Sequence, residues 1–347
     1  MGKQSARMYF NGDHKDIYFR GKYHKAMFVG AECVWYKIEE DFFSFKVSDC
    51  MIDTFGNIRT DLQSGKIVLS IGCSKKEDGS RNQLRINWGD DTTETVQDSR
   101  TLREHTYPTN DGTEYEVKIY GKIGYFLGTT YYNGMISSCI TEILTPLQKT
   151  MTMQSGAEYG ELPKLNGMFA NALSLKTISP NMFVEYRSIY EEIDAHGIFE
   201  NTSIEYVPEL IFSGLYSVNI AGAFMNCKKL KTVAASCLLG ADYTTANSLF
   251  KGCELLDYIP STLFIDGFAD VENFDECFYE CTSLTGVPIT LFDQATMGNS
   301  FVRAFYMDTN ITSEVPPLWE RQNAIGTDCY FGCARAENYD EIPVAWQ

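Results

Sequence analysis

The chain has 347 residues, of which 44% are hydrophobic and 14% aromatic, and this composition excludes wholesale disorder. Because a single hydrophobic core rarely includes so many residues, the length predicts two or three domains. The formal net charge of -17 opposes contact with phosphate backbones, so we expect no nucleic-acid partner. We also expect no membrane insertion and no export signal, because apolar runs fall short of the ~18 residues of a membrane helix and the first residues lack a signal peptide's apolar core.

The segment 1–40 predicts a chain of short β-hairpins. Residues 8–37 consist of aromatic and β-branched runs separated by the turn signals Asn11-Gly12, Gly21 and Gly30. A segment of this size is too small to be securely stable alone, so we expect it to pair with a neighbouring domain or another subunit.

The aromatic and glycine spacing in IYFRGKYHKAMFVGAECVWYK resembles the N-terminal segments of phage tail, fibre and baseplate-associated proteins. In those proteins the segment attaches the polypeptide to the particle. The resemblance therefore implies a virion-attachment segment at 1–40 that contacts other virion proteins. The alternative is a β-rich subdomain that only caps the domain after it.

Residues 41–127 predict an antiparallel β-sandwich, because the strand-like runs FFSFKV, KIVLSIGC, QLRINWGD and EYEVKIYG alternate with polar or glycine-bearing turns. The runs INWGDDTTETV and EHTYPTNDGTEYEVKIYG resemble the PKD domain, an immunoglobulin-like module. The residues that match its motif are Trp88, Gly89, Asp90, His105, Tyr107, Tyr115 and Val117. Asp91 stands where the motif usually has glycine. The resemblance implies a spacer or adhesion module.

Residues 128–347 contain a repeat of 25 to 30 residues, a period typical of solenoids. Each copy begins at an aromatic anchor: Phe169, Phe199, Phe224, Phe250, Phe278, Phe305 and Tyr330. Three positions later comes a small residue, a cysteine or an aspartate: Ala172, Thr202, Cys227, Cys253, Cys281, Asp308 and Cys333. A segment of the form L-x-x-I/V follows. We expect equivalent residues of successive copies to stack, with L-x-x-I/V as a strand and F-x-x-C as a turn or short helix.

The copy FYECTSLTGVPITLF resembles the leucine-rich repeats of BspA-like surface proteins. Such repeats occur in surface proteins of gut bacteria and in virion proteins of the phages that infect them. The resemblance implies a leucine-rich-repeat solenoid over 128–347, and the expected fold class of the whole chain is mainly β. Because four of the eleven cysteines fall at one repeated core position, we favour buried thiols over a disulfide framework.

Residues for catalysis or metal binding are sparse, so we expect no enzyme, no cofactor and no metal. None of His14, His24, His105 and His196 sits in a catalytic motif. Asp90, Asp91 and Asp98 offer oxygen ligands without the spacing of a calcium loop; we favour an Asp-rich turn, and calcium binding stays open. Two cysteine pairs without histidine partners, Cys277/Cys281 and Cys329/Cys333, favour buried thiols over zinc.

The outward strand positions of a solenoid form an extended face suited to large partners. In this chain they are Lys176-Thr177, Glu205-Tyr206, Lys231-Thr232, Asp257-Tyr258 and Thr285-Gly286. The candidate binding residues are Lys176, Tyr206, Lys231, Asp257 and Tyr258. The two tyrosines are suited to stacking on sugar rings or anchoring a protein partner. The alternative is that they only cover neighbouring coils.

These patterns predict a phage virion structural protein, on the tail, baseplate or capsid, as a fibre or decoration. Its solenoid would serve host attachment by binding host-surface glycan or protein, or would bind another virion protein, and homo-oligomers are compatible with this role. We expect assembly in the host cytoplasm, where cysteines stay reduced. The alternatives are a bacterial cell-surface adhesin with PKD and leucine-rich repeats and, third, a glycan-degrading enzyme.

Overall fold

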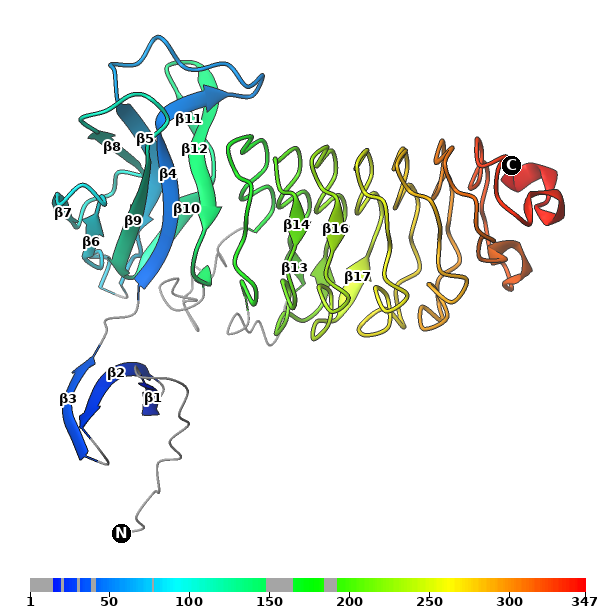
Figure 1. Ribbon diagram of the computed structural model, residues 1–347, viewed down its shortest axis with the longest axis horizontal. Coiled ribbons are helices and arrows are strands. Elements are labelled where there is room, and N and C mark those ends of the chain that lie inside the picture. The colour runs from blue at the N-terminus through cyan, green and yellow to red at the C-terminus, as the bar shows by residue number, and fades with distance from the viewer. Residues whose placement is uncertain are drawn as a thin grey trace. The chain divides into compact units, whose positions relative to one another are not determined.

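The computed structural model describes residues 15–19, 22–29, 32–38, 42–76, 78–147, 165–183 and 192–347 (Figure 1). Contacts divide the chain into two compact units, 1–42 and 43–347. The described residues are mainly β, with several antiparallel sheets and almost no helix. This confirms the mainly β class that the strand-like runs predicted.

The first unit contains a three-stranded antiparallel sheet of β1 (Lys15–Phe19), β2 (Lys22–Val29) and β3 (Glu32–Ile38), in chain order. Phe19 pairs with Lys22, and Val29 pairs with Glu32. Two residues separate the members of each pair in the sequence, as in the shortest hairpins. The strands thus lie within the segment predicted to form hairpins, while the turn signals Asn11-Gly12, Gly21 and Gly30 lie outside the described residues.

The second unit begins with two antiparallel sheets. Their strands are β4 (Phe42–Asp53), β5 (Lys66–Cys73), β6 (Leu84–Asn87), β7 (Thr93–Val96), β8 (Leu102–Thr106), β9 (Glu114–Gly121), β10 (Ile123–Leu127), β11 (Thr130–Tyr132) and β12 (Met135–Ile143). The six-stranded sheet has the order β11-β12-β4-β9-β6-β7, and the three-stranded sheet has the order β10-β5-β8. Alternate residues of β9, such as Val117 and Ile119, are fully buried, as expected for a strand with one face against a core.

Side chains of the two sheets meet in one core. Phe43 and Phe45 of β4 lie with their rings 5.0 and 5.5 Å from the ring of Phe126 in β10. The Phe126 ring also lies 5.9 Å from Phe169, the first repeat anchor. The core of the sheets is therefore continuous with the core of the repeats, and a domain boundary at 127/128 stays a prediction.

Successive copies of the repeat lie side by side (Figure 1), and their anchor rings form one stack. Neighbouring centroids are 5.3 to 5.7 Å apart along Phe169, Phe199, Phe224, Phe250, Phe278, Phe305 and Tyr330. Backbone hydrogen bonds join each of these anchors except the last to the residue before the next anchor; for example, the Phe199 N–H donates to the Ala223 carbonyl at 2.9 Å. The predicted stacking of equivalent residues is therefore present in these copies.

The cysteine position forms a second row inside the repeats. The Sγ–H groups of Cys227, Cys253, Cys281 and Cys333 donate to the anchor carbonyl of the preceding copy, at 3.1 to 3.2 Å. The ten cysteines whose surroundings are described are free, and all of them except Cys50 are buried. Burial raises the pKa of the Cys227 thiol to about 11, so the thiol stays protonated. The interpretation as buried thiols is confirmed for these residues.

Short parallel strands join the copies. They are β13 (Ile193–Asp194), β14 (Tyr206–Val207), β15 (Val218–Asn219), β16 (Thr232–Val233) and β17 (Tyr243–Thr245). The pair β14-β16 lies in the L-x-x-I/V segments, where strands were predicted. The sheet β13-β15-β17 lies shortly before the anchors, outside the L-x-x-I/V segments, and was not predicted.

The F-x-x-C stretches form turns, for a reason visible in the backbone. The residue two positions after each anchor has a positive φ, between 53° and 88°: Asn171, Asn201, Asn226, Gly252, Glu280, Met307 and Gly332. A left-handed residue interrupts a right-handed helix, and asparagine and glycine adopt this conformation most readily. Among the described residues, helical structure is confined to short 3-10 helices such as η2 (Leu318–Glu320), η3 (Tyr339–Glu341) and η4 (Val344–Trp346).

Candidate functional site

A continuous series of backbone hydrogen bonds joins the L-x-x-I/V segments. The N–H groups of Lys176, Glu205, Lys231, Asp257, Thr285 and Thr312 donate to the carbonyls of Thr141, Lys176, Glu205, Lys231, Asp257 and Thr285, at 2.9 to 3.5 Å. We call the paired residues of five of these segments the exposed ladder, and each pair a rung: Lys176-Thr177, Glu205-Tyr206, Lys231-Thr232, Asp257-Tyr258 and Thr285-Gly286. The first rung is bonded to β12, so the ladder starts at the six-stranded sheet.

Each rung is exposed because the residues on both sides of it point into the core. Ile204 and Val207, which flank Glu205-Tyr206, are fully buried, and the same pattern recurs in the other segments. All five candidate binding residues are exposed and lie on four consecutive rungs. Tyr206 is 44% exposed and Tyr258 is 60% exposed. The structure brings the candidate residues together; their role in binding stays a prediction.

Charges alternate along one column of the exposed ladder, in the order Lys176, Glu205, Lys231 and Asp257. The Lys231 ammonium lies 3.0 Å from the Glu205 carboxylate and holds the pKa of that carboxyl below its usual value of 4.5. Two positive and two negative side chains cancel. These four side chains of the ladder therefore have no net charge, although the whole chain has a net charge of -17.

Ring-bearing and short side chains alternate along the other column, which reads Thr177, Tyr206, Thr232, Tyr258 and Gly286. Tyr206 and Thr232 are direct partners in the β14-β16 pair. Because neighbouring strands are about 4.8 Å apart, the two tyrosines stand two rungs, or roughly 10 Å, from each other. Thr232 between them leaves space above the backbone.

Sequence reasoning missed an outer row of aromatic residues next to the anchors. The Tyr279 and Tyr306 rings stack at 4.9 Å, and the Tyr306 and Phe331 rings stack at 4.8 Å. The Lys251 ammonium lies 4.5 Å from the centre of the Tyr279 ring. The signal was present in the alignment, because an aromatic residue directly follows the anchor in three successive copies.

A group of exposed apolar residues on the sheets was also missed. Tyr131 is 69% exposed and pairs with Ile136, which is 42% exposed. Phe55 and Ile58, in the connection from β4 to β5, are 86% and 59% exposed. Phe55 and Ile58 lie in a loop, and loop residues have no periodic pattern from which their exposure could be predicted.

The residues that carry the PKD resemblance form one cluster. The Trp88 and His105 rings stack at 4.6 Å, and the His105 Nε2 atom lies 2.8 Å from an Asp90 carboxylate oxygen. The buried Tyr107 hydroxyl donates to the Trp88 carbonyl at 2.8 Å, and burial raises its pKa. Asp91 has a φ of 67°, the conformation that glycine adopts at such a turn.

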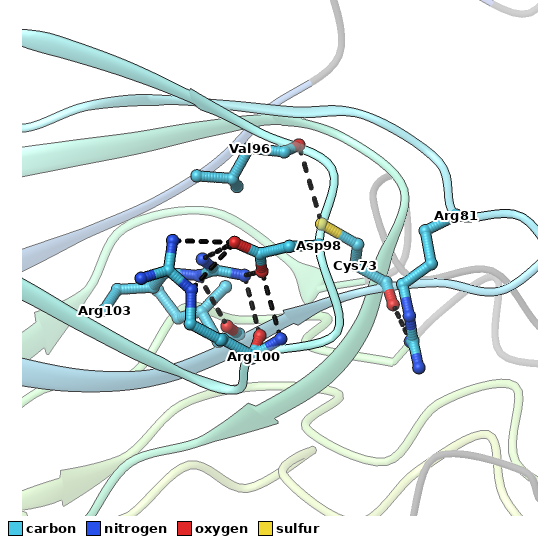
Figure 2. Close-up of polar contacts among 7 residues, drawn as sticks. Cys73, Arg81, Val96, Asp98, Arg100 and Arg103 are labelled. Atoms are coloured by element: carbon cyan, nitrogen blue, oxygen red, sulfur yellow. Dashed lines mark hydrogen bonds and ion pairs between the residues drawn. The ribbon is translucent and has the colours of Figure 1, made fainter.

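Asp98 belongs to a different polar cluster (Figure 2). Its carboxylate accepts hydrogen bonds from Arg100 and from the buried Arg103, the closest at 2.7 Å, and these bonds hold its pKa far below 3.8. Asp90 instead accepts from Thr92 and contacts His105. The structure thus does not join Asp90 and Asp98 in one set of calcium ligands.

Other candidates for metal or catalytic chemistry are also accounted for. Among the residues that the structure describes, no group of three or more His, Cys, Asp or Glu side chains could hold a metal ion. His196 is exposed, whereas His14 and the His24 side chain lie outside the described parts of the chain. Cys277 and Cys329 are buried, and burial raises the pKa of both thiols.

Comparisons with protein-family models, curated proteins and solved structures gave no match to this chain. Within the described ranges, no helix is long and apolar enough to cross a membrane. The inference of function therefore depends on the residues and contacts of the chain itself, and above all on the exposed ladder.

Proposed function

We propose that the chain is a non-enzymatic structural protein of a bacteriophage particle, located on the tail, baseplate or capsid as a fibre or decoration. Residues 128–347 form a leucine-rich-repeat solenoid that presents the exposed ladder to host-surface glycan or protein, or to another virion protein. Residues 41–127 form a PKD-like β-sandwich that acts as a spacer. Residues 1–40 attach the chain to other virion proteins.

The observation that carries this proposal is the hydrogen-bonded exposed ladder, with its candidate residues on consecutive rungs. Repeated elements that bury their apolar side chains against each other leave one long face for a large partner. Tyr206 and Tyr258 add ring surface to that face, and aromatic residues are frequent anchors of binding.

Three further features support the proposal. The cluster of Trp88, His105 and Tyr107 gives the PKD-like part a packed core, as a rigid spacer needs. The free and buried cysteines suit a chain that folds in the reducing cytoplasm of the host, where virions assemble. The net charge of -17 favours protein or glycan partners over nucleic acid.

Electron microscopy of particles produced with and without this protein tests the proposal. We expect particles that lack it to lose a defined density on the tail, baseplate or capsid, and antibodies against the repeats to label that position on complete particles. An unchanged particle would remove the virion role. Labelling of the bacterial surface instead of the particle would favour the cell-surface adhesin.

A further inference from the structure

We infer that the exposed ladder binds a neutral, linear polysaccharide that lies across the rungs, with its sugar rings stacked on Tyr206 and Tyr258. This inference rests on the proposed function and adds the chemical class of the ligand. It follows from three properties of the ladder: its period, its charge and its direction.

The period of the side chains is two rungs. Tyr206 and Tyr258 are exposed and are separated by the rung of the short Thr232, and the same two-rung alternation governs the charged column. Two strand spacings measure about 10 Å. An extended pair of linked sugar rings has this length, so two rings of the polymer that are one such pair apart lie on Tyr206 and Tyr258.

The charge of the ladder favours a neutral ligand. Lys231 is bonded to Glu205 at 3.0 Å, and Lys176 further lowers the pKa of Glu205 by its charge. A polyanion would meet Glu205 and Asp257 as well as the lysines, and it would be repelled by the net negative charge of the chain. A neutral polymer accepts hydrogen bonds from the lysines and donates hydroxyls to the carboxylates without this repulsion.

The direction of the ligand follows from the hydrogen bonds between rungs. The rungs from Lys176 to Thr285 form an unbroken succession of backbone donors and acceptors, so equivalent side-chain positions recur about one strand spacing apart. A polymer with equal steps matches this succession along its whole length. A globular protein partner has no such repeat, and this favours the polysaccharide.

Affinity electrophoresis of the full chain tests the inference, with gels that contain mixed-linkage β-glucan, glucomannan or xylan as neutral linear polymers and hyaluronan as an acidic one. We expect retardation by at least one neutral polymer and none by hyaluronan. Cellotetraose should compete better than cellobiose, because only the longer sugar spans both tyrosines. Failure of all three neutral polymers, or stronger retardation by hyaluronan, overturns the inference.

Variants locate the site. Tyr206→Ala and Tyr258→Ala should each weaken the retardation about tenfold, as expected for an anchor ring. Tyr216→Ala is the matched control, since Tyr216 is 49% exposed but lies off the ladder, and it should bind like the unchanged chain. Equal binding by all three variants would place the polysaccharide elsewhere and contradict the inference.

The two proposals fail in different ways. If no polysaccharide binds while complete particles still carry the protein, the ligand class is wrong and the virion role stands. If particles do not contain the protein, the virion role is wrong, and the gels still decide whether the ladder binds a neutral polysaccharide.

Discussion

Asp308 occupies the position at which other copies have cysteine, and its replacement should stabilise the chain in a pH-dependent way. The side chain is 0% exposed, and neither carboxylate oxygen has a hydrogen-bond partner among the described residues. Burial raises its pKa well above 3.8, and the nearby Glu280 charge acts in the same direction. The folded chain therefore keeps this carboxyl protonated at pH values where the unfolded chain has lost the proton.

The sign of the pH dependence follows from this difference. Below pH 3.8 the Asp308 carboxyl holds its proton in both the folded and the unfolded state, so its ionisation does not reduce the free energy of unfolding. As the pH rises, only the unfolded state ionises, and the free energy of unfolding falls by about 1.4 kcal/mol per pH unit until the folded-state pKa is reached. The fall begins near pH 4, where the unfolded state ionises, and ends when the pH reaches the folded-state pKa.

Urea unfolding of the unchanged chain and of Asp308→Cys, at pH values from 4 to 7, measures this effect. The stability advantage of Asp308→Cys should grow as the pH rises from 4, because only the unchanged chain loses stability when Asp308 of its unfolded state ionises. Thr202→Cys is the matched control, because Thr202 is a neutral residue at the equivalent position and donates to the Phe199 carbonyl at 3.0 Å. The difference in the free energy of unfolding between Thr202→Cys and the unchanged chain should not vary with pH. A constant difference for Asp308→Cys as well would refute the reasoning.

Three further predictions concern the stability of the fold. Phe250→Ala removes a ring that stacks at 5.5 Å on Phe224, so it should lower the free energy of unfolding by about 3 to 5 kcal/mol. Tyr258 is exposed, and Tyr258→Ala should change the free energy of unfolding by less than about 0.5 kcal/mol. Equal losses for the two variants would contradict the role of the ring stack in stability. Asp91→Gly should raise the free energy of unfolding by about 0.5 to 1 kcal/mol, and the melting temperature with it, because glycine adopts the left-handed backbone conformation of this position more easily than aspartate does. A lower melting temperature would contradict this explanation. Asp98→Ala removes the carboxylate that pairs with the buried Arg103, so the free energy of unfolding measured in urea should fall by about 1 to 2 kcal/mol. This magnitude allows for the 38% exposure of the Asp98 side chain, which weakens the ion pair. An unchanged free energy of unfolding would show that the pair does not stabilise the fold.

Repetition made much of the fold predictable. Because the pattern recurs at seven anchors, the alignment placed Phe250 on Phe224 and assigned the cysteines to buried rows before any contact was known. The alternation of buried and exposed residues in the L-x-x-I/V segments likewise predicted the exposure of Tyr206 and Tyr258. These features depend on local sequence and on equivalence between copies, which a single sequence contains.

Features that depend on contacts between dissimilar segments were not predictable in the same way. The sequence places Asp90 and Asp98 close together, yet one contacts His105 and the other Arg103, because they follow different strands. The alignment put Asp308 in the cysteine row but did not show that its carboxyl lacks a partner. The strand β13 lies outside the L-x-x-I/V segments, whose recurrence was the signal for the strands that were predicted.

The rate at which complete particles adsorb to host cells tests the central claim, that the exposed ladder is the outward binding face of a virion protein. Particles that carry Tyr206→Ala together with Tyr258→Ala should adsorb more slowly than unchanged particles, while particles with Tyr216→Ala should adsorb at the normal rate. Particles with the paired substitution that contain the normal amount of the protein and adsorb at the normal rate would contradict the claim.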